Sequence, residues 1–102
     1  MSAPAELVIE VTAEDIAKGI AQDCAECPIA LAARRLYPAA RMHIGGELTR
    51  EIAAYWPEQA YYDMPDEAVD FVAVFDDGGT VAPFTFTARR QDRAAVPEGA
   101  GP

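Results

Sequence analysis

Pro28 constrains the fold of this chain more than any other residue, because a proline fits an α-helix only at its first turn. The preceding segment offers two helix starts, an N-cap at Asp23 or an N-cap at Cys27. Only the second start keeps the proline out of the helix interior, so we predict a turn over 23–27 and the main helix over 28–36. Its predicted buried stripe consists of Ile29, Ala32, Ala33 and Leu36.

The residues before this helix predict a strand followed by a short helix. Apolar and polar side chains alternate over 7–11, which predicts a strand whose core-facing residues are Leu7, Ile9 and Val11. Thr12 suits a helix N-cap, and Asp15 three positions later completes a capping box. We therefore predict a helix over 13–18 that stops at Gly19 in a left-handed conformation.

The middle of the chain predicts a hairpin. Residues 41–44 alternate as a strand does, and Gly45-Gly46 then predicts a two-residue turn, because glycine adopts positive φ at little cost. Residues 47–55 are helical by propensity, but we favour a strand because Trp56-Pro57 ends the run. A further short strand with two tyrosines is predicted over 59–63.

The C-terminal part predicts a second clear helix and a last strand. Pro65 stands at the predicted first helical position, and the helix ends before Gly78. Its buried stripe is predicted to be Ala68, Phe71, Val72 and Phe75. Residues 84–87 alternate phenylalanine with threonine, which predicts the final strand. We expect residues 89–102 to form a flexible tail in which Arg89, Arg90 and Arg93 either bind the acidic domain or remain free.

Together these elements predict an α+β fold, in which four to five mostly antiparallel strands pack against two main helices and one short helix. The 102 residues suffice for one domain only. We place that domain at residues 1–88, with an ordered core over about 6–88.

The charge balance bears on partners. The chain has 17 acidic and 8 basic side chains, a net charge of −9 and a pI near 4.3. Direct nucleic-acid binding is not expected, since it depends on basic side chains that displace counterions. Neither a signal peptide nor an apolar run of membrane-spanning length is present, so we expect a cytoplasmic protein that does not enter a membrane.

Cys24 and Cys27 are the most reactive residue types in the chain. A Cys-x-x-Cys pair at a helix start resembles a redox dithiol, because the helix dipole lowers the pKa of a thiol there. With His43 the two cysteines supply three of the four ligands that a zinc site needs. We favour the structural alternative, a pair of buried or semi-buried thiols, and therefore expect no cofactor, no metal and no catalytic residue.

A binding surface is predicted where aromatic and acidic residues gather. Between Glu58 and Asp77 lie seven acids and no base. That region attracts a basic protein, although the acids alone also serve solubility. Tyrosine and tryptophan dominate binding hot spots when exposed, but a core role for most of these aromatics is the favoured alternative. The candidate binding residues are Tyr55, Trp56, Tyr61, Tyr62, Asp63, Asp66, Glu67 and Asp70.

Three stretches resemble a family of small proteins of unassigned activity from actinobacteria and their phages. They run from Val11 to Ile16 with Gly19, from Asp23 through Cys27-Pro28 to Ala32 with Arg34, and from Tyr62 to Pro65 and on through Phe75-Asp76-Asp77-Gly78 to Phe86. The resemblance implies a phage or prophage accessory gene. It carries over no catalytic residue, because its motifs are helix caps, turns and core faces.

These observations lead us to expect a non-enzymatic protein-binding accessory module, plausibly phage-encoded, that acts through the acidic and aromatic surface. A sharper version is mimicry of nucleic acid, in which carboxylates occupy a basic cleft of the partner. The alternatives are a small redox or zinc protein that uses Cys24 and Cys27, and a structural or oligomerising component of a virion or complex.

Overall fold

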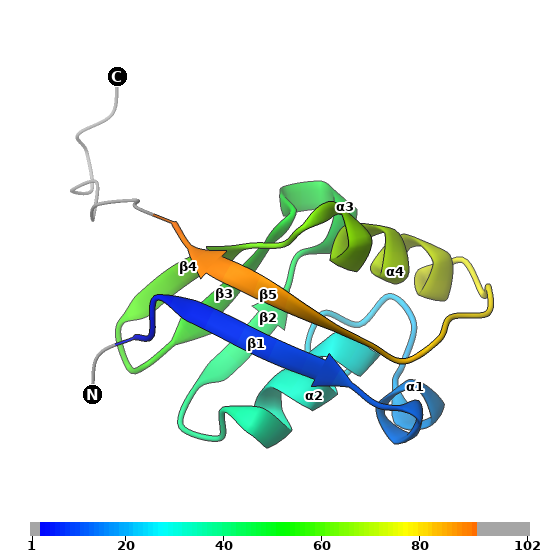
Figure 1. Cartoon of the computed structure of the whole chain (residues 1–102), viewed down its shortest axis with the longest axis horizontal. Coiled ribbons are helices and arrows are strands. Elements are labelled where there is room, and N and C mark those ends of the chain that lie inside the picture. The colour runs from blue at the N-terminus through cyan, green and yellow to red at the C-terminus, as the bar shows by residue number, and fades with distance from the viewer. Residues whose placement is uncertain (1–2, 92–102) are drawn as a thin grey trace.

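The computed structural model describes residues 3–91, which form a curled sheet of five strands with helices on one face (Figure 1). The strands are β1 (Glu6–Val11), β2 (Arg41–Ile44), β3 (Glu51–Tyr55), β4 (Gln59–Asp63) and β5 (Phe84–Arg90). The helices are α1 (Ala13–Lys18), α2 (Pro28–Leu36), α3 (Gly46–Thr49) and α4 (Asp66–Asp76). The predicted α+β class, with four to five mostly antiparallel strands and two main helices, is therefore confirmed: the sheet has five strands, all antiparallel, and a second short helix, α3, joins the predicted short helix α1.

The sheet order is β1-β5-β4-β3-β2, so the strand that comes last in the sequence lies between the first strand and the hairpin of β3 and β4. Strand β5 pairs along its length with β1, from Glu6 opposite Arg89 to Val11 opposite Phe84. It meets β4 only at its end, where Tyr62 faces Arg90 and Asp63 faces Arg89. The two halves of the sheet are thus offset along the strands.

One face of the sheet carries the hydrophobic core, as the strict alternation of burial along β1 shows. Side chains of α2 and α4 cover this face, among them Ile29 and Ala68, neither of which has exposed surface. The predicted core of the first strand is confirmed, with Leu7, Ile9 and Val11 at most 1% exposed. The opposite, outer face bears polar and half-buried residues such as Thr87, Tyr61 and His43.

The segment around α2 fastens both edge strands of the sheet. At the β2 edge, the backbone N–H of Ile44 donates to the Cys24 carbonyl at 3.0 Å. At the β1 edge, the N–H of Val8 donates to the Tyr37 hydroxyl at 2.9 Å, and Arg35 donates to the Glu10 carbonyl at 3.0 Å. Unpaired edge groups otherwise invite strand addition by other chains. The predicted main helix and the residues that flank it thus form hydrogen bonds to both edge strands of the sheet.

The predicted helix caps and ends are largely correct. Thr12 and Asp15 form the capping box of α1, and Cys27 is the N-cap of α2 with Pro28 at its first position. Gly19 is wrong as a left-handed stop, because its φ of −67° is extended and the positive φ of 62° falls on Gln22. Pro65 is the N-cap of α4 rather than its first residue.

Three further predictions need correction. Gly45-Gly46 is not a two-residue hairpin turn: residues 46–49 form α3, and β3 begins only after Arg50, whose φ is 58°. Leu36 is 38% exposed rather than buried, because it lies in the last turn of α2. Arg89 and Arg90 belong to β5, where Arg89 pairs with Glu6 at 3.2 Å. Arg93 and the rest of the predicted tail lie outside the described residues.

Candidate functional site

The turn that precedes α2 positions both cysteines. The Asp23 carboxylate accepts hydrogen bonds from the N–H groups of Ala25 and Glu26, each at 3.0 Å, and the Asp23 carbonyl accepts from Cys27 N–H at 2.9 Å. Asp23 therefore caps a single turn of its own, and Cys27 then caps the helix, its Sγ accepting from Ala30 N–H at 3.4 Å. Both candidate starts are used in succession.

The two cysteines are free thiols in different surroundings. Cys24 is exposed, whereas Cys27 is only 4% exposed. Burial raises the pKa of the Cys27 thiol to about 11, against the weaker opposing effect of the N–H groups of Ala30 and Ile29. The redox alternative, which requires a lowered thiol pKa, therefore does not fit Cys27. The favoured structural role of a buried thiol fits Cys27 but not Cys24, which is exposed.

The zinc ligands proposed from the sequence do not come together. Among residues 3–91, no group of three histidine, cysteine or acidic side chains is arranged to hold a metal ion. His43 lies on the outer face, where its ring meets Tyr55 edge to face with centroids 6.3 Å apart. Cys24 and Cys27 instead line a groove on the other side of β2.

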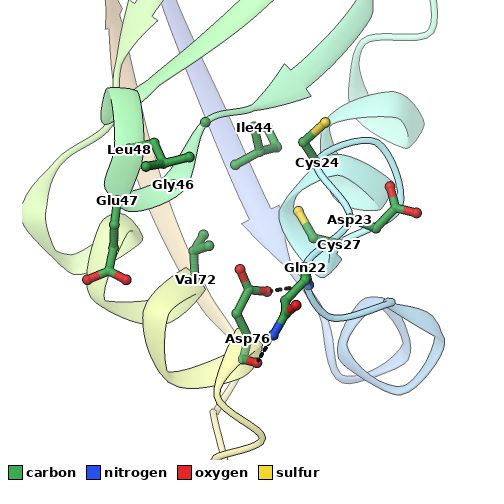
Figure 2. Close-up of a pocket in the computed structure, with 11 residues that line it drawn as sticks. Gln22, Asp23, Cys24, Cys27, Ile44, Gly46, Glu47, Leu48, Val72 and Asp76 are labelled. Atoms are coloured by element: carbon green, nitrogen blue, oxygen red, sulfur yellow. Dashed lines mark hydrogen bonds between the residues drawn. The ribbon is translucent and has the colours of Figure 1, made fainter.

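This groove lies between α3, α4 and the loop 22–27 (Figure 2). Two adjoining hollows of about 330 Å³ and about 650 Å³ make it up, and both are lined by Gln22, Glu47 and Asp76. We call it the acidic groove, because the described residues that line it include four acids and no base. The four are Asp23, Glu47, Asp76 and Asp77.

Two contacts shape the acidic groove. Gln22 bridges to α4, where its N–H donates to the Asp76 carboxylate at 2.8 Å and its side-chain amide donates to the Asp76 carbonyl at 3.3 Å (Figure 2). On the opposite wall, Gly46 adopts φ +60° against Val72, and an added Cβ would lie 2.9 Å from Val72 Cγ1. Asp76 thus has a structural role besides its charge.

Exposed apolar side chains stand beside the acidic groove. Leu48 on α3 is 95% exposed and lines it, and Val74 on α4 is 44% exposed at its far end. Isolated exposed aliphatic residues are common, but here two of them flank a hollow. Sequence reasoning missed Leu48, because the prediction placed residues 47–55 in a strand with this residue among its apolar positions.

The predicted acidic residues keep their exposure on α4 and β4. Glu67 and Asp70 are exposed on the outer side of α4. Asp66 forms an ion pair with Arg50, so part of its charge is neutralised locally. Asp63 accepts a hydrogen bond from the Gln91 side chain at 2.9 Å. The acidic half of the predicted surface is therefore accessible, and the exposed Asp77 at the end of α4 lines the acidic groove.

The four aromatic residues of the predicted surface fall into two groups, one buried in the core and one half-buried on the outer face of the sheet. Trp56 is 7% exposed and Tyr62 has no exposed surface, so neither is available to a partner, and the favoured core role is correct for both. The Tyr62 hydroxyl donates to the Pro4 carbonyl at 2.7 Å, and burial raises its pKa. Tyr55 and Tyr61 are half-buried on the outer face of the sheet, away from the core.

Comparisons with known proteins add no relative: no family model, no curated protein and no solved structure matches this chain. In the part of the chain that the structure describes, no helix is both long and apolar enough to cross a membrane.

Proposed function

We propose that this protein is a non-enzymatic accessory module that binds a basic protein partner through the acidic groove and the neighbouring outer side of α4. The observation that carries the proposal is the pairing of charge and apolar exposure: among residues 3–91, the lining of the groove has four acids and no base, and Leu48 beside it is 95% exposed. An isolated acidic patch serves solubility, whereas an acidic rim around exposed aliphatic residues suits a partner segment with both cationic and apolar side chains.

The electrostatics of α4 support the same proposal. Asp76 and Asp77 stand at the C-terminal end of the helix, and no basic residue lies in its last turn. Negative charge there is opposed by the helix dipole, at a cost of about 0.3–1 kcal/mol per charge. Asp76 offsets this cost through its bonds to Gln22, but no hydrogen bond or ion pair involves the Asp77 side chain among the described residues. A cationic partner would relieve this local repulsion.

We also propose where the protein acts and how its acidic surface is used. Resemblance to small proteins of actinobacteria and their phages supports a phage-type accessory role in the host cytoplasm. Within that role, carboxylates on α4 and along the acidic groove would occupy a basic cleft of the partner, as in nucleic-acid mimicry. Such a complex weakens with salt, because exposed charges are screened over about 8 Å at physiological ionic strength.

The test is quantitative affinity purification from an actinobacterial host lysate at low and high salt. We expect one basic protein to be retained by the unmodified protein, and to be lost with Leu48→Ser and with the charge reversal Asp70→Lys.

Matched controls are Val8→Ser, which alters an aliphatic residue that is 53% exposed on β1, and Glu10→Lys, which reverses an exposed charge on the same strand. Both should retain the partner. Retention by Leu48→Ser and Asp70→Lys at the level of the controls, or binding unaffected by salt, would overturn the proposal.

A further inference from the structure

Another hollow, separate from the acidic groove, lies on the outer face of the sheet, where β2 and β3 pair and the chain turns towards β4. Its volume is about 590 Å³. Arg41 and Tyr55 are directly opposite each other in the β2–β3 register, so both project from the same face. In the part of the chain that the structure describes, no acidic residue lines this hollow, in contrast to the acidic groove. We call it the Arg41 hollow, and its lining consists of Ala39, Arg41, His43, Tyr55, Trp56 and Pro57.

Arg41 differs from every other described basic side chain. Its guanidinium has no ion pair, hydrogen bond or ring contact among residues 3–91, although it is exposed in a protein with more than twice as many acids as bases. The other described lysine and arginine side chains are all engaged: Lys18, Arg34, Arg35, Arg50 and Arg89 in ion pairs, and Arg90 with the Ala3 carbonyl.

The sequence explains why Arg41 has no partner among residues 3–91. No acidic residue occurs between Glu26 and Glu47, and the residues that pair with β2 in the sheet are Ile52, Ala53, Ala54 and Tyr55. An arginine surrounded by aromatic and apolar residues keeps its five N–H donors for an external acceptor. The position is thus a local exception to the acidic character of the surface.

The walls of the Arg41 hollow are held in place by contacts of their own. The Tyr55 hydroxyl accepts a hydrogen bond from the Gln59 side chain at 2.8 Å, and the same ring meets His43 edge to face. Trp56 is buried and packs edge to face on Tyr37, with centroids 6.0 Å apart. Because these side chains are already fixed, less conformational entropy is lost when a ligand binds.

We propose that the Arg41 hollow binds a carboxylate carried on an aromatic or other flat apolar body. The planar guanidinium of Arg41 matches a carboxylate in a two-bond fork, and His43 supplies a ring N–H donor beside it. Tyr55 and Pro57 provide the apolar contact for the body of the ligand, because Trp56 is only 7% exposed and serves mainly as the fixed floor of the hollow. A single negative charge fits best, because the net charge of −9 opposes a more highly charged anion.

Benzoate is the probe, titrated into the full chain with detection by calorimetry and by NMR shifts. We expect saturable binding in which the amides of β2 and of Trp56 shift, and at least about tenfold weaker binding by Arg41→Gln, the loss that a charged hydrogen bond implies. The control Arg89→Gln removes an arginine of the same face that already pairs with Glu6, and it should bind benzoate like the unmodified protein.

Three further ligands decide the chemistry and its source. Benzamide, which has the same shape and no charge, should bind at least about tenfold more weakly than benzoate. An acetylated Ala-Phe dipeptide with a free carboxyl end tests whether a peptide terminus is the source: tighter binding than benzoate assigns a peptide end, and weaker binding assigns a free acid. The proposal would be overturned if benzamide bound as tightly as benzoate, or if phenyl phosphate bound more tightly than benzoate. It would also be overturned if benzoate did not bind at about 10 mM, or if Arg41→Gln bound benzoate as tightly as the unmodified protein.

Discussion

The guanidinium of Arg35 on α2 donates to the carboxylate of Asp15 on α1 at 2.9 Å. The same carboxylate oxygen accepts from the N–H of Thr12 at 2.9 Å, so one buried acid completes the cap of α1 and ties that helix to α2. Burial pushes the pKa of Asp15 upwards, but the hydrogen bonds from Thr12 and Arg35 outweigh it and the net pKa is lowered.

Asp15→Asn should therefore lower the free energy of unfolding by about 1–2 kcal/mol, because it removes a charge-assisted bond and weakens the cap. The neighbouring change Glu14→Gln is the control, since the Glu14–Lys18 pair is largely exposed and should matter by less than about 0.5 kcal/mol. Urea denaturation measures both. Equal effects of the two changes would contradict this account of Asp15.

Lowering the pH should weaken the stabilising interactions of the Asp15 carboxylate with Arg35 and Thr12. A carboxyl group with a lowered pKa in the folded state stabilises the protein above its ordinary pKa of 3.8, and this contribution is lost as the pH falls from there through the folded-state pKa. We expect the difference in unfolding free energy between the unmodified protein and Asp15→Asn to shrink over that range. A difference that stays constant from neutral pH down to pH 2 or about that would be inconsistent with the lowered pKa.

The two thiols should react very differently. At pH 8 iodoacetamide should modify Cys24 readily and Cys27 hardly at all, because Cys27 is buried and its pKa is raised to about 11. Intact mass spectrometry should show one adduct on the folded protein and two after denaturation. The raised pKa also means that stability falls as the pH rises from 9.0 towards 11, as the unfolded chain then ionises first. Two adducts at similar rates on the folded protein would contradict burial of Cys27.

Tyr37→Phe tests the closure of the β1 edge. The change removes the hydroxyl that accepts from Val8 N–H, and should lower the unfolding free energy by about 0.5–1.5 kcal/mol with faster hydrogen exchange at Val8. Tyr55→Phe is matched to it, since it removes a hydroxyl whose one hydrogen-bond partner among residues 3–91 is the exposed Gln59 side chain, and should have a smaller effect. Unchanged exchange at Val8 would exclude a role for Tyr37 at the edge.

Gly46→Ala tests the wall of the acidic groove. Alanine there meets both a left-handed backbone conformation, at about 1–2 kcal/mol, and a close contact with Val72. Gly78→Ala shares the positive φ but places its methyl group in open space, so the difference between the two variants isolates the contact. We expect Gly46→Ala to be the more destabilising in thermal unfolding; equal stability would show that Val72 yields without cost.

Local signals in the sequence were sufficient for much of the fold. Pro28 and the Thr12–Asp15 pair act within one helical turn, so their predictions required no knowledge of distant residues. The Gly45-Gly46 prediction failed because the conformation of Gly46 depends on packing against Val72, which is 26 residues away in the sequence and on another helix. Turn propensity carries no information about such a contact.

The candidate sites were less predictable for the same reason. The acids of α4 were found from composition alone, but burial of Trp56 and Tyr62 follows from the register of β3 and β4 and from contacts with Tyr37 and Pro4. The Arg41 hollow was missed altogether. Its one signal in the sequence is an arginine in a stretch without acids, and this becomes informative only once the ion pairs of the other arginines are known.

The interior position of β5, between β1 and β4, has a consequence for how the protein is made. Strand β1 and the β3–β4 hairpin have no direct pairing, and both depend on a strand that ends at Arg90. During synthesis, the sheet therefore cannot be completed until this strand has left the ribosome. A chain that terminated before Phe84 would leave β1 and β4 without the strand that joins them, so premature stop codons anywhere upstream should yield fragments that are degraded and not shortened working domains.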